Sequence, residues 1–275
     1  MKARVQVGDA DVTVDLSRPV SLARELDFRA PQPRHFGAPP ATSQPYSVPG
    51  FSGSVAAGAS CNCDVLTLIP HCNGTHTECV GHLTREPLDV HRIVPAGLVP
   101  AILISVRPVA ANASHETTEP PPHADDRLIT RSAIENRWPR TSSFEPQALI
   151  IRTEFTGAGV FHDAATGSTS ARSPPFLSSE AAQLLAERGI DHLVIDLPSI
   201  DREHDEGRLS AHRLFFGLPT GAVLSQASRP QATITELAHI PAELADGPYL
   251  LELQIPAWRG DAVPSRPLLY DFRRA

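Results

Sequence analysis

Four side chains that can bind a metal or transfer a proton lie within one eleven-residue run, Cys72 to His82, which reads CNGTHTECVGH. They are Cys72, His76, Glu78 and His82, and each is two or four positions from the next. An extended chain would therefore carry all four on one face. A thiol, two imidazoles and a carboxylate form the ligand set of a borderline metal such as zinc.

The Asn73-Gly74 dipeptide inside this run is a turn signal and argues against a helix. A fully extended chain covers about 3.3 Å per residue, so Cys72 and His76 can share an ion only if the backbone folds back between them. We therefore expect a bend at Gly74.

His82 follows Gly81 and lies further from the centre of the run. This position suits proton transfer better than metal ligation. The alternative for the whole run is a half-buried strand that happens to carry polar residues. Counting His71, the stretch holds three histidines and a glutamate, which are costly to bury without partners, so this alternative is disfavoured.

The run resembles the H-x-G-T-H-x-D-x-P-x-H motif of the cyclase family, which includes bacterial kynurenine formamidases and isatin hydrolases. Four residues match the motif: Gly74, Thr75, His76 and His82. Three others stand where the family has histidine, aspartate and proline, namely Cys72, Glu78 and Val80. Cys72 either binds metal as a thiolate or leaves the ligand position to His71, or the site holds fewer metals than its relatives.

The composition excludes several classes of protein. A net charge of -7 over 275 residues gives no electrostatic footprint for nucleic acid. The 27 prolines and the low aromatic content of 5% indicate long ordered loops rather than a helical bundle. The start of the chain, MKARVQVGDADVTV, lacks the apolar segment of a signal peptide or membrane span, so we expect a cytoplasmic protein without a membrane partner.

All four cysteines fall within nineteen residues, at positions 61, 63, 72 and 79. A reducing compartment disfavours disulfides. The spacing matches no common structural zinc finger, so we expect free thiols here.

Alternating apolar residues at 3–7 and 11–16 predict an opening hairpin. A helix is expected over 179–188, capped by Ser178 or Ser179, and it leads into a strand at 192–197. Further strands are expected at 64–69, 99–106, 148–152, 233–237, 249–255 and 267–272. Without a repeat or linker, this pattern predicts one α/β domain with mixed sheets over residues 1–275, and the resemblance implies the swivelling β/β/α layered fold of the family.

Residues 26–60 form a stretch rich in proline, glycine and serine. A loop of this length often covers an active site. Its aromatic residues either stack on a flat substrate or pack onto the core, and they are Phe28, Phe36, Tyr46 and Phe51.

A metal centre built from one short segment would be open on one side, so we expect ligands from later in the chain. Ala211-His212-Arg213 resembles the histidine-arginine segment of the family, in which the histidine binds metal, and Ile234 to Leu237 resembles its E-x-L segment, whose glutamate is a ligand. Without the resemblance, a lone His212 is more often a surface or core residue. Glu236 in an apolar strand requires a metal or base as partner, unless it is exposed on an edge strand. Asp201 and Asp205 are expected in a solvated loop.

The leading hypothesis is a metal-dependent hydrolase that cleaves a C–N bond of an aryl formamide, amide or cyclic amide. One or two divalent ions, zinc in preference to manganese, would be held by Cys72 (or His71), His76, Glu78, His212 and Glu236. His82 would transfer protons. The resemblance implies that Glu78 bridges two ions and that the protein is a homodimer. The alternatives are a divergent member that binds a small carbonyl ligand and hydrolyses little, and a zinc ion with a purely structural role.

Overall fold

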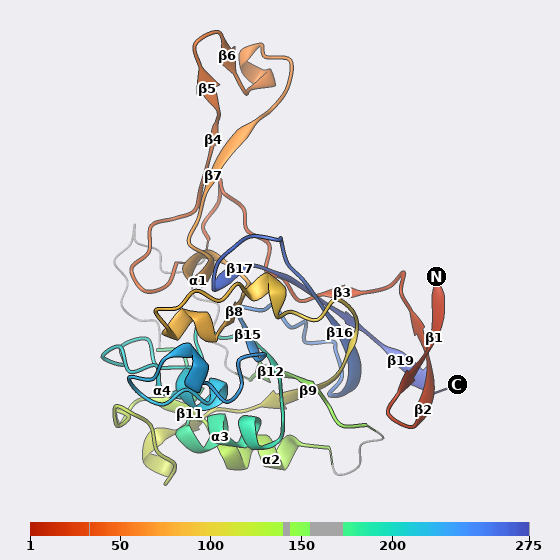
Figure 1. Ribbon diagram of the computed structural model, residues 1–275, viewed down its shortest axis with the longest axis vertical. Helices are drawn as coiled ribbons and strands as arrows, with labels where there is room; N and C mark the ends of the chain where they lie inside the picture. The colour runs from red at the N-terminus through yellow and green to blue at the C-terminus, as the bar shows by residue number, and fades with distance from the viewer. Residues whose placement is uncertain (33, 140–143, 155–172, 275) are drawn as a thin grey trace.

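The structure is a computed structural model that describes residues 1–32, 34–139, 144–154 and 173–274 (Figure 1). Its centre is a nine-stranded mixed sheet. The strands follow the spatial order β17 Ala262–Pro264, β8 His76–Cys79, β15 Thr233–Glu236, β14 His192–Ile195, β12 Ala148–Thr153, β9 Val99–Val106, β16 Gly247–Gln254, β18 Arg266–Tyr270 and β3 Val20–Ser21. Segments from both ends of the chain thus lie in one sheet, and β8 lies between two late strands.

The central strands are parallel and buried on both faces. β9 pairs in parallel with β12, β12 with β14, and β14 with β15. Successive side chains of β9 alternate between two cores, since Ile102 and Ile104 pack on one face and Ala101 and Leu103 on the other. Burial on both faces explains why this strand reads as a continuous apolar run.

The helices of the described residues are α1 Pro70–Asn73, α2 Arg131–Arg137, α3 Ser179–Glu187 and α4 Ser210–Phe216. Ser178 caps α3, and its Oγ accepts a hydrogen bond of 3.0 Å from the Ala181 amide. α3 packs against both α2 and α4 and buries Leu184 and Leu185 in the same core as Ile102. This helical layer fixes the position of α4 beside the sheet. No helix in the described part of the chain is long and apolar enough to cross a membrane.

Two smaller sheets accompany the large one. The first joins β1 Lys2–Val7 and β2 Ala10–Asp15 to β19 Phe272–Arg274, so both ends of the chain lie together at the right of Figure 1. The second contains β10 Val109–Ala110, β11 Arg127–Ile129 and β13 Phe176–Leu177. The predicted hairpin, the predicted helix and the predicted strands at the sheet centre are therefore confirmed.

Residues 42–67 form an arm that extends away from the rest of the molecule, at the top of Figure 1. It consists of two strand pairs, β4 Thr42–Pro45 with β7 Asp64–Thr67 and β5 Ser47–Val48 with β6 Phe51–Ser52. Tyr46 and Phe51 lie on this arm with their ring centroids 6.3 Å apart. These two aromatic residues therefore do not pack onto the core of the sheet.

Candidate metal centre

The sequence predicted an extended run from Cys72 to His82 with a bend at Gly74, and the structure differs from this prediction. Cys72 lies in the short helix α1, β8 starts at His76, and His82 lies in the 3-10 turn η2 Val80–Leu83. Gly74 is extended, with φ -177° and ψ -176°, so the change of direction comes from α1 and not from Gly74. The alternation predicted for the run holds only between His76 and Glu78.

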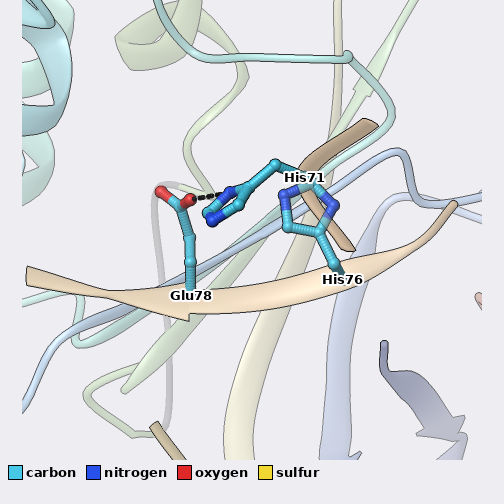
Figure 2. Close-up of side chains that lie close together, drawn as sticks. All are labelled: His71, His76 and Glu78. Atoms are coloured by element: carbon cyan, nitrogen blue, oxygen red, sulfur yellow. Dashed lines mark ion pairs between the residues drawn. The ribbon is translucent and has the colours of Figure 1, made fainter. Parts of the chain in front are cut away.

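His76 and Glu78 point to the same side of β8, and His71 reaches toward Glu78 from α1 (Figure 2). The Nδ1 atom of His71 lies 2.9 Å from Oε2 of Glu78. His76 and Glu78 are almost fully buried, at 0% and 1% exposure. A short stretch of early sequence thus brings two imidazoles and one carboxylate together, with His76 and Glu78 shielded from solvent and His71 partly exposed.

The later part of the chain completes this cluster. In the antiparallel pairing of β15 with β8, Glu236 stands directly opposite His76, and Oε2 of Glu236 lies 3.5 Å from His76 Nε2. His212 on α4 places Nε2 2.8 Å from Glu78 Oε1 and 3.6 Å from Glu236 Oε1. The structure therefore brings together four residues that the sequence singled out, His76, Glu78, His212 and Glu236.

The close contacts of Glu78 with His71 and His212 are ion pairs that do not meet hydrogen-bond geometry. Both of its carboxylate oxygens, and Nε2 of His76, are buried without a partner of hydrogen-bond geometry, although imidazole nitrogens approach the two oxygens to 2.8 and 2.9 Å. A buried carboxylate that faces nitrogens at these distances requires a positive charge beside it, which a protonated imidazole or a metal ion supplies. The orphaned atoms therefore fit a bound cation.

The other nitrogen of each imidazole is fixed by an oxygen acceptor. Nδ1 of His76 donates to the Gly74 carbonyl at 3.0 Å. Nδ1 of His212 contacts Asp201 Oδ2 at 2.6 Å, and Nε2 of His71 contacts Asp261 Oδ2 at 3.1 Å. Metal-binding histidines are oriented in this way, with one ring nitrogen bound to a protein oxygen and the other free for the ion.

Three groups of side chains in the described residues bring their possible ligand atoms within 4.8 Å of one another. They are His71 with His76 and Glu78, Glu78 with His212 and Glu236, and His71 with His82 and Asp261. Glu78 belongs to two of these groups and His71 to two. Nitrogen and carboxylate ligands of this kind suit zinc and manganese.

The charges of the cluster stabilise one another. Burial disfavours ionisation of Glu78, but His212 and His71 outweigh burial and hold the pKa of that carboxyl well below its ordinary value. Burial likewise disfavours the charged form of His212, but Glu78 and Asp201 raise its pKa well above the ordinary value. The site thus favours anionic carboxylates next to positive charge, which a divalent cation would supply in place of the imidazole protons.

Cys72 lies outside these groups. Its side chain is buried, and burial raises the pKa of the thiol, which opposes the thiolate that a metal requires. The neighbouring His71 points into the cluster instead. Of the two residues that the sequence offered for the first ligand position, the structure brings only His71 to Glu78.

The sequence did not predict that Asp201 and Asp261 lie at the site. The sequence suggested that Asp201 lies in a solvated loop, and this prediction is wrong. Asp201 is 6% exposed and accepts hydrogen bonds from the Ala211 and His212 amides at 2.8 and 3.0 Å. Asp205 is also buried. Asp261 carries no local signal in the sequence.

His82 lies beside the cluster rather than inside it. Its ring stacks on that of His71, with centroids 4.3 Å apart, and is 5.9 Å from the ring of His212. Its side chain is 28% exposed, and Nδ1 lies 3.4 Å from Asp261 Oδ2. An imidazole at the open edge of a metal site can exchange protons with solvent and with a bound molecule.

Comparison with known proteins defines the class of this protein. The family described as Putative cyclase matches residues 14–202, and the chain belongs to this family. The resemblance inferred from the motif and the predicted mixed α/β fold of the family are both confirmed. No curated protein matches the sequence.

Several solved structures share the fold. The structure of a predicted metal-dependent hydrolase from Bacillus stearothermophilus is 16% identical with a TM-score of 0.56, over 92% of this chain and 98% of that one. Isatin hydrolase A from Labrenzia aggregata, bound to benzyl benzoate, is 17% identical with a TM-score of 0.58, over 92% and 93%. Isatin hydrolase A from Ralstonia solanacearum is 16% identical with a TM-score of 0.59, over 92% and 91%.

Proposed function

We propose that this protein is a metal-dependent hydrolase that cleaves a C–N bond of an aryl formamide, amide or cyclic amide. The observation that carries the proposal is the set of orphaned buried atoms of His76 and Glu78, placed where late residues of the chain converge. Proteins of the same fold that are named metal-dependent hydrolases and isatin hydrolases support this class of reaction.

We assign the metal ligands to His71, His76, Glu78, His212 and Glu236. Glu78 directs Oε2 toward His71 and Oε1 toward His212, so in this proposal Glu78 would be a ligand shared by two ions. A divalent ion, zinc in preference to manganese, would polarise a carbonyl group and lower the pKa of a water molecule to about 7. The protein contributes the burial of the ligands and their fixed orientation.

His82 transfers protons in this proposal. It is half-buried next to His71 and contacts the ionised Asp261. Cleavage of a C–N bond requires a proton on the leaving nitrogen, and a positioned imidazole accelerates such a transfer by about 10²- to 10⁴-fold. His82 takes a proton from the attacking water and returns it to the nitrogen.

The test combines metal analysis with hydrolysis assays. Purified protein, reconstituted with zinc or manganese, is screened against aryl formamides, lactams and lactones, together with the His82→Ala variant. We expect the variant to keep its metal and lose turnover. The control is His239→Ala, because the His239 side chain is exposed on the segment after β15. Unchanged turnover in His82→Ala would refute the proton-transfer role, and a protein that binds no divalent metal would refute the hydrolase.

A divergent, non-catalytic member is the second candidate, because a cysteine replaces the first histidine of the motif. The position of His71 argues against it, since this imidazole supplies the nitrogen that Cys72 lacks. A stoichiometric metal content with binding of a carbonyl compound but no turnover would favour the binding protein.

We also propose that the protein is a homodimer in which the arm of residues 42–67 is covered. Isolated two-stranded hairpins are marginally stable in water, and this arm exposes apolar side chains that include Val48, Val55, Val65 and Leu66. Light scattering should give twice the chain mass, and Leu66→Asp should shift the measured mass toward that of the monomer.

The single domain over residues 1–275 and the cytoplasmic location stay predictions from the sequence.

A further inference from the structure

Asp261 is held beside the metal cluster by the edge of the large sheet. It directly precedes β17, which pairs antiparallel with β8 so that Ala262 is opposite Glu78 and Pro264 is opposite His76. The carbonyl of Asp261 itself accepts a hydrogen bond of 3.0 Å from the Cys79 amide. The backbone hydrogen bonds between β17 and β8 therefore fix the position of Asp261 along β8 relative to the proposed ligands.

The other side of Asp261 is fixed by the segment after η2. The Gly260 amide donates to Asp89 Oδ1 at 3.1 Å, and the Gly260 carbonyl accepts from the Val90 amide at 2.9 Å. A Cβ atom at Gly81 would lie 2.8 Å from the Leu88 carbonyl oxygen and 3.3 Å from Asp261 Cβ. Gly81 thus permits a close approach between Asp261 and the turn that carries His82.

One carboxylate oxygen of Asp261 faces two imidazoles. Oδ2 lies 3.1 Å from His71 Nε2 and 3.4 Å from His82 Nδ1, and the two rings stack at an interplanar angle of 30°. The Asp261 side chain is 40% exposed, so solvent reaches it, and an exposed aspartate is anionic at neutral pH.

These contacts select the protonated nitrogen in both rings. A carboxylate only accepts hydrogen bonds, so it favours a proton on His71 Nε2 and on His82 Nδ1. Nδ1 of His71 faces the Glu78 carboxylate at 2.9 Å, so it would be free of its proton only when a metal ion takes that proton's place. His82 presents Nε2 for proton exchange. One oxygen of Asp261 therefore orients a proposed metal ligand and sets the tautomer of the proposed acid–base residue.

We infer that Asp261 is a positioning residue that fixes the tautomer and ring orientation of His82 and the ring orientation of His71, a role that rests on the proposed hydrolase function. The competing role is direct metal ligation, because His71, His82 and Asp261 also form one of the three groups with converging ligand atoms. The two roles differ in what happens to metal content when the carboxylate is removed.

The experiment uses the full chain with Asp261→Ala, Asp261→Asn and Asp261→Glu. Asp271→Asn is the matched control, because Asp271 is an exposed carboxylate in the same terminal segment. Metal per chain is measured by elemental analysis. The kinetic constants kcat and KM are measured with the best substrate of the screen. The His82 tautomer is determined by ¹⁵N NMR of the metal-free protein.

We expect Asp261→Ala to keep the metal stoichiometry, to lower kcat about 10- to 100-fold with KM changed less than about threefold, and to reduce the Nδ1-protonated fraction of His82. Asp261→Glu should recover part of kcat, and the Asp271 control should match the wild type. Loss of a metal equivalent in Asp261→Ala, or an unchanged His82 tautomer, would overturn the positioning role. Because the NMR measurement needs neither metal nor substrate, it tests Asp261 even if the protein hydrolyses nothing.

Discussion

Glu236 and His76 stand directly opposite each other in the pairing of β15 with β8, with Glu236 Oε2 3.5 Å from His76 Nε2. The other oxygen of Glu236, Oε1, accepts a hydrogen bond of 2.8 Å from the Ile200 amide. A shift of this register by one residue would turn one of the two side chains to the opposite face of the sheet. The strand pairing therefore determines whether the early and late halves of the chain share the proposed metal site.

Glu236→Gln should weaken metal binding more than about 100-fold, since loss of a residue that only orients a ligand already costs about 10- to 100-fold. The amide keeps the shape and can still accept from Ile200, so the metal-free protein should fold normally. Affinity is measured by competition with a chromogenic chelator and folding by urea denaturation. Glu252→Gln is the control, because Glu252 lies on β16 and accepts from Tyr270 instead. Equal metal affinities of the Glu236 variant and the wild type would contradict the assignment.

His71→Ala should lose one equivalent of metal, whereas Cys72→Ala should retain the wild-type metal content. The structural reason is that His71 Nδ1 reaches Glu78 while the Cys72 thiol is buried away from the ligand groups. Removal of the small Cys72 side chain should cost about 1 to 2 kcal/mol of unfolding free energy. Elemental analysis of both variants settles the comparison, and metal loss in Cys72→Ala alone would restore the thiolate as the first ligand.

Much of the fold was predictable because local patterns and burial agree. The apolar run of β9 and the capped helix α3 are fixed by their own residues, and both were predicted from them. The sequence could predict that His76 and Glu78 belong to one cluster, because their spacing places both side chains on the same face of a strand.

The rest depends on distant contacts that no local pattern contains. Asp261 reaches the site only because β17 pairs with β8, and Asp201 is buried only because it binds the first amides of α4. Whether His71 or Cys72 faces the cluster depends on the rotation of the short helix α1. The sequence did not predict this helix, because residues 73–74 indicate a turn. Composition likewise identified a long loop before β8 but not the arm that part of it forms.

Chelation should abolish hydrolysis while the fold survives, because the two large apolar cores of the sheet do not depend on the metal cluster. At a free metal concentration of about 1,000 times the Kd, metal removal costs about 4 kcal/mol. For a chain of this size, that should lower the Tm by roughly 8 °C. Far-UV circular dichroism should be unchanged after chelation, and added zinc or manganese should restore activity. Complete unfolding on chelation would instead indicate a structural zinc site.

His192, which lies outside the metal cluster, should make the free energy of unfolding depend on pH. It lies buried on β14 with Nδ1 2.9 Å from Thr233 Oγ1, and burial lowers its pKa to about 4. The unfolded chain, with an ordinary histidine pKa of about 6.5, binds more protons between these values, so unfolding free energy rises with pH there. The contribution is fully present above pH 6.5 and is lost as the pH falls toward 4.

Urea denaturation of the metal-free protein at pH 7.5, 5.5 and 4.5 measures this effect. The wild type should lose at most about 3 kcal/mol from His192 over that range, and His192→Asn should lose correspondingly less. Asp196 titrates in the same window with the opposite sign, because burial raises the pKa of its carboxyl to about 6. The difference between variant and wild type removes this term, since both proteins retain Asp196. His239→Asn, at an exposed position, should follow the wild-type curve, and parallel curves for all three proteins would show that His192 does not couple folding to pH.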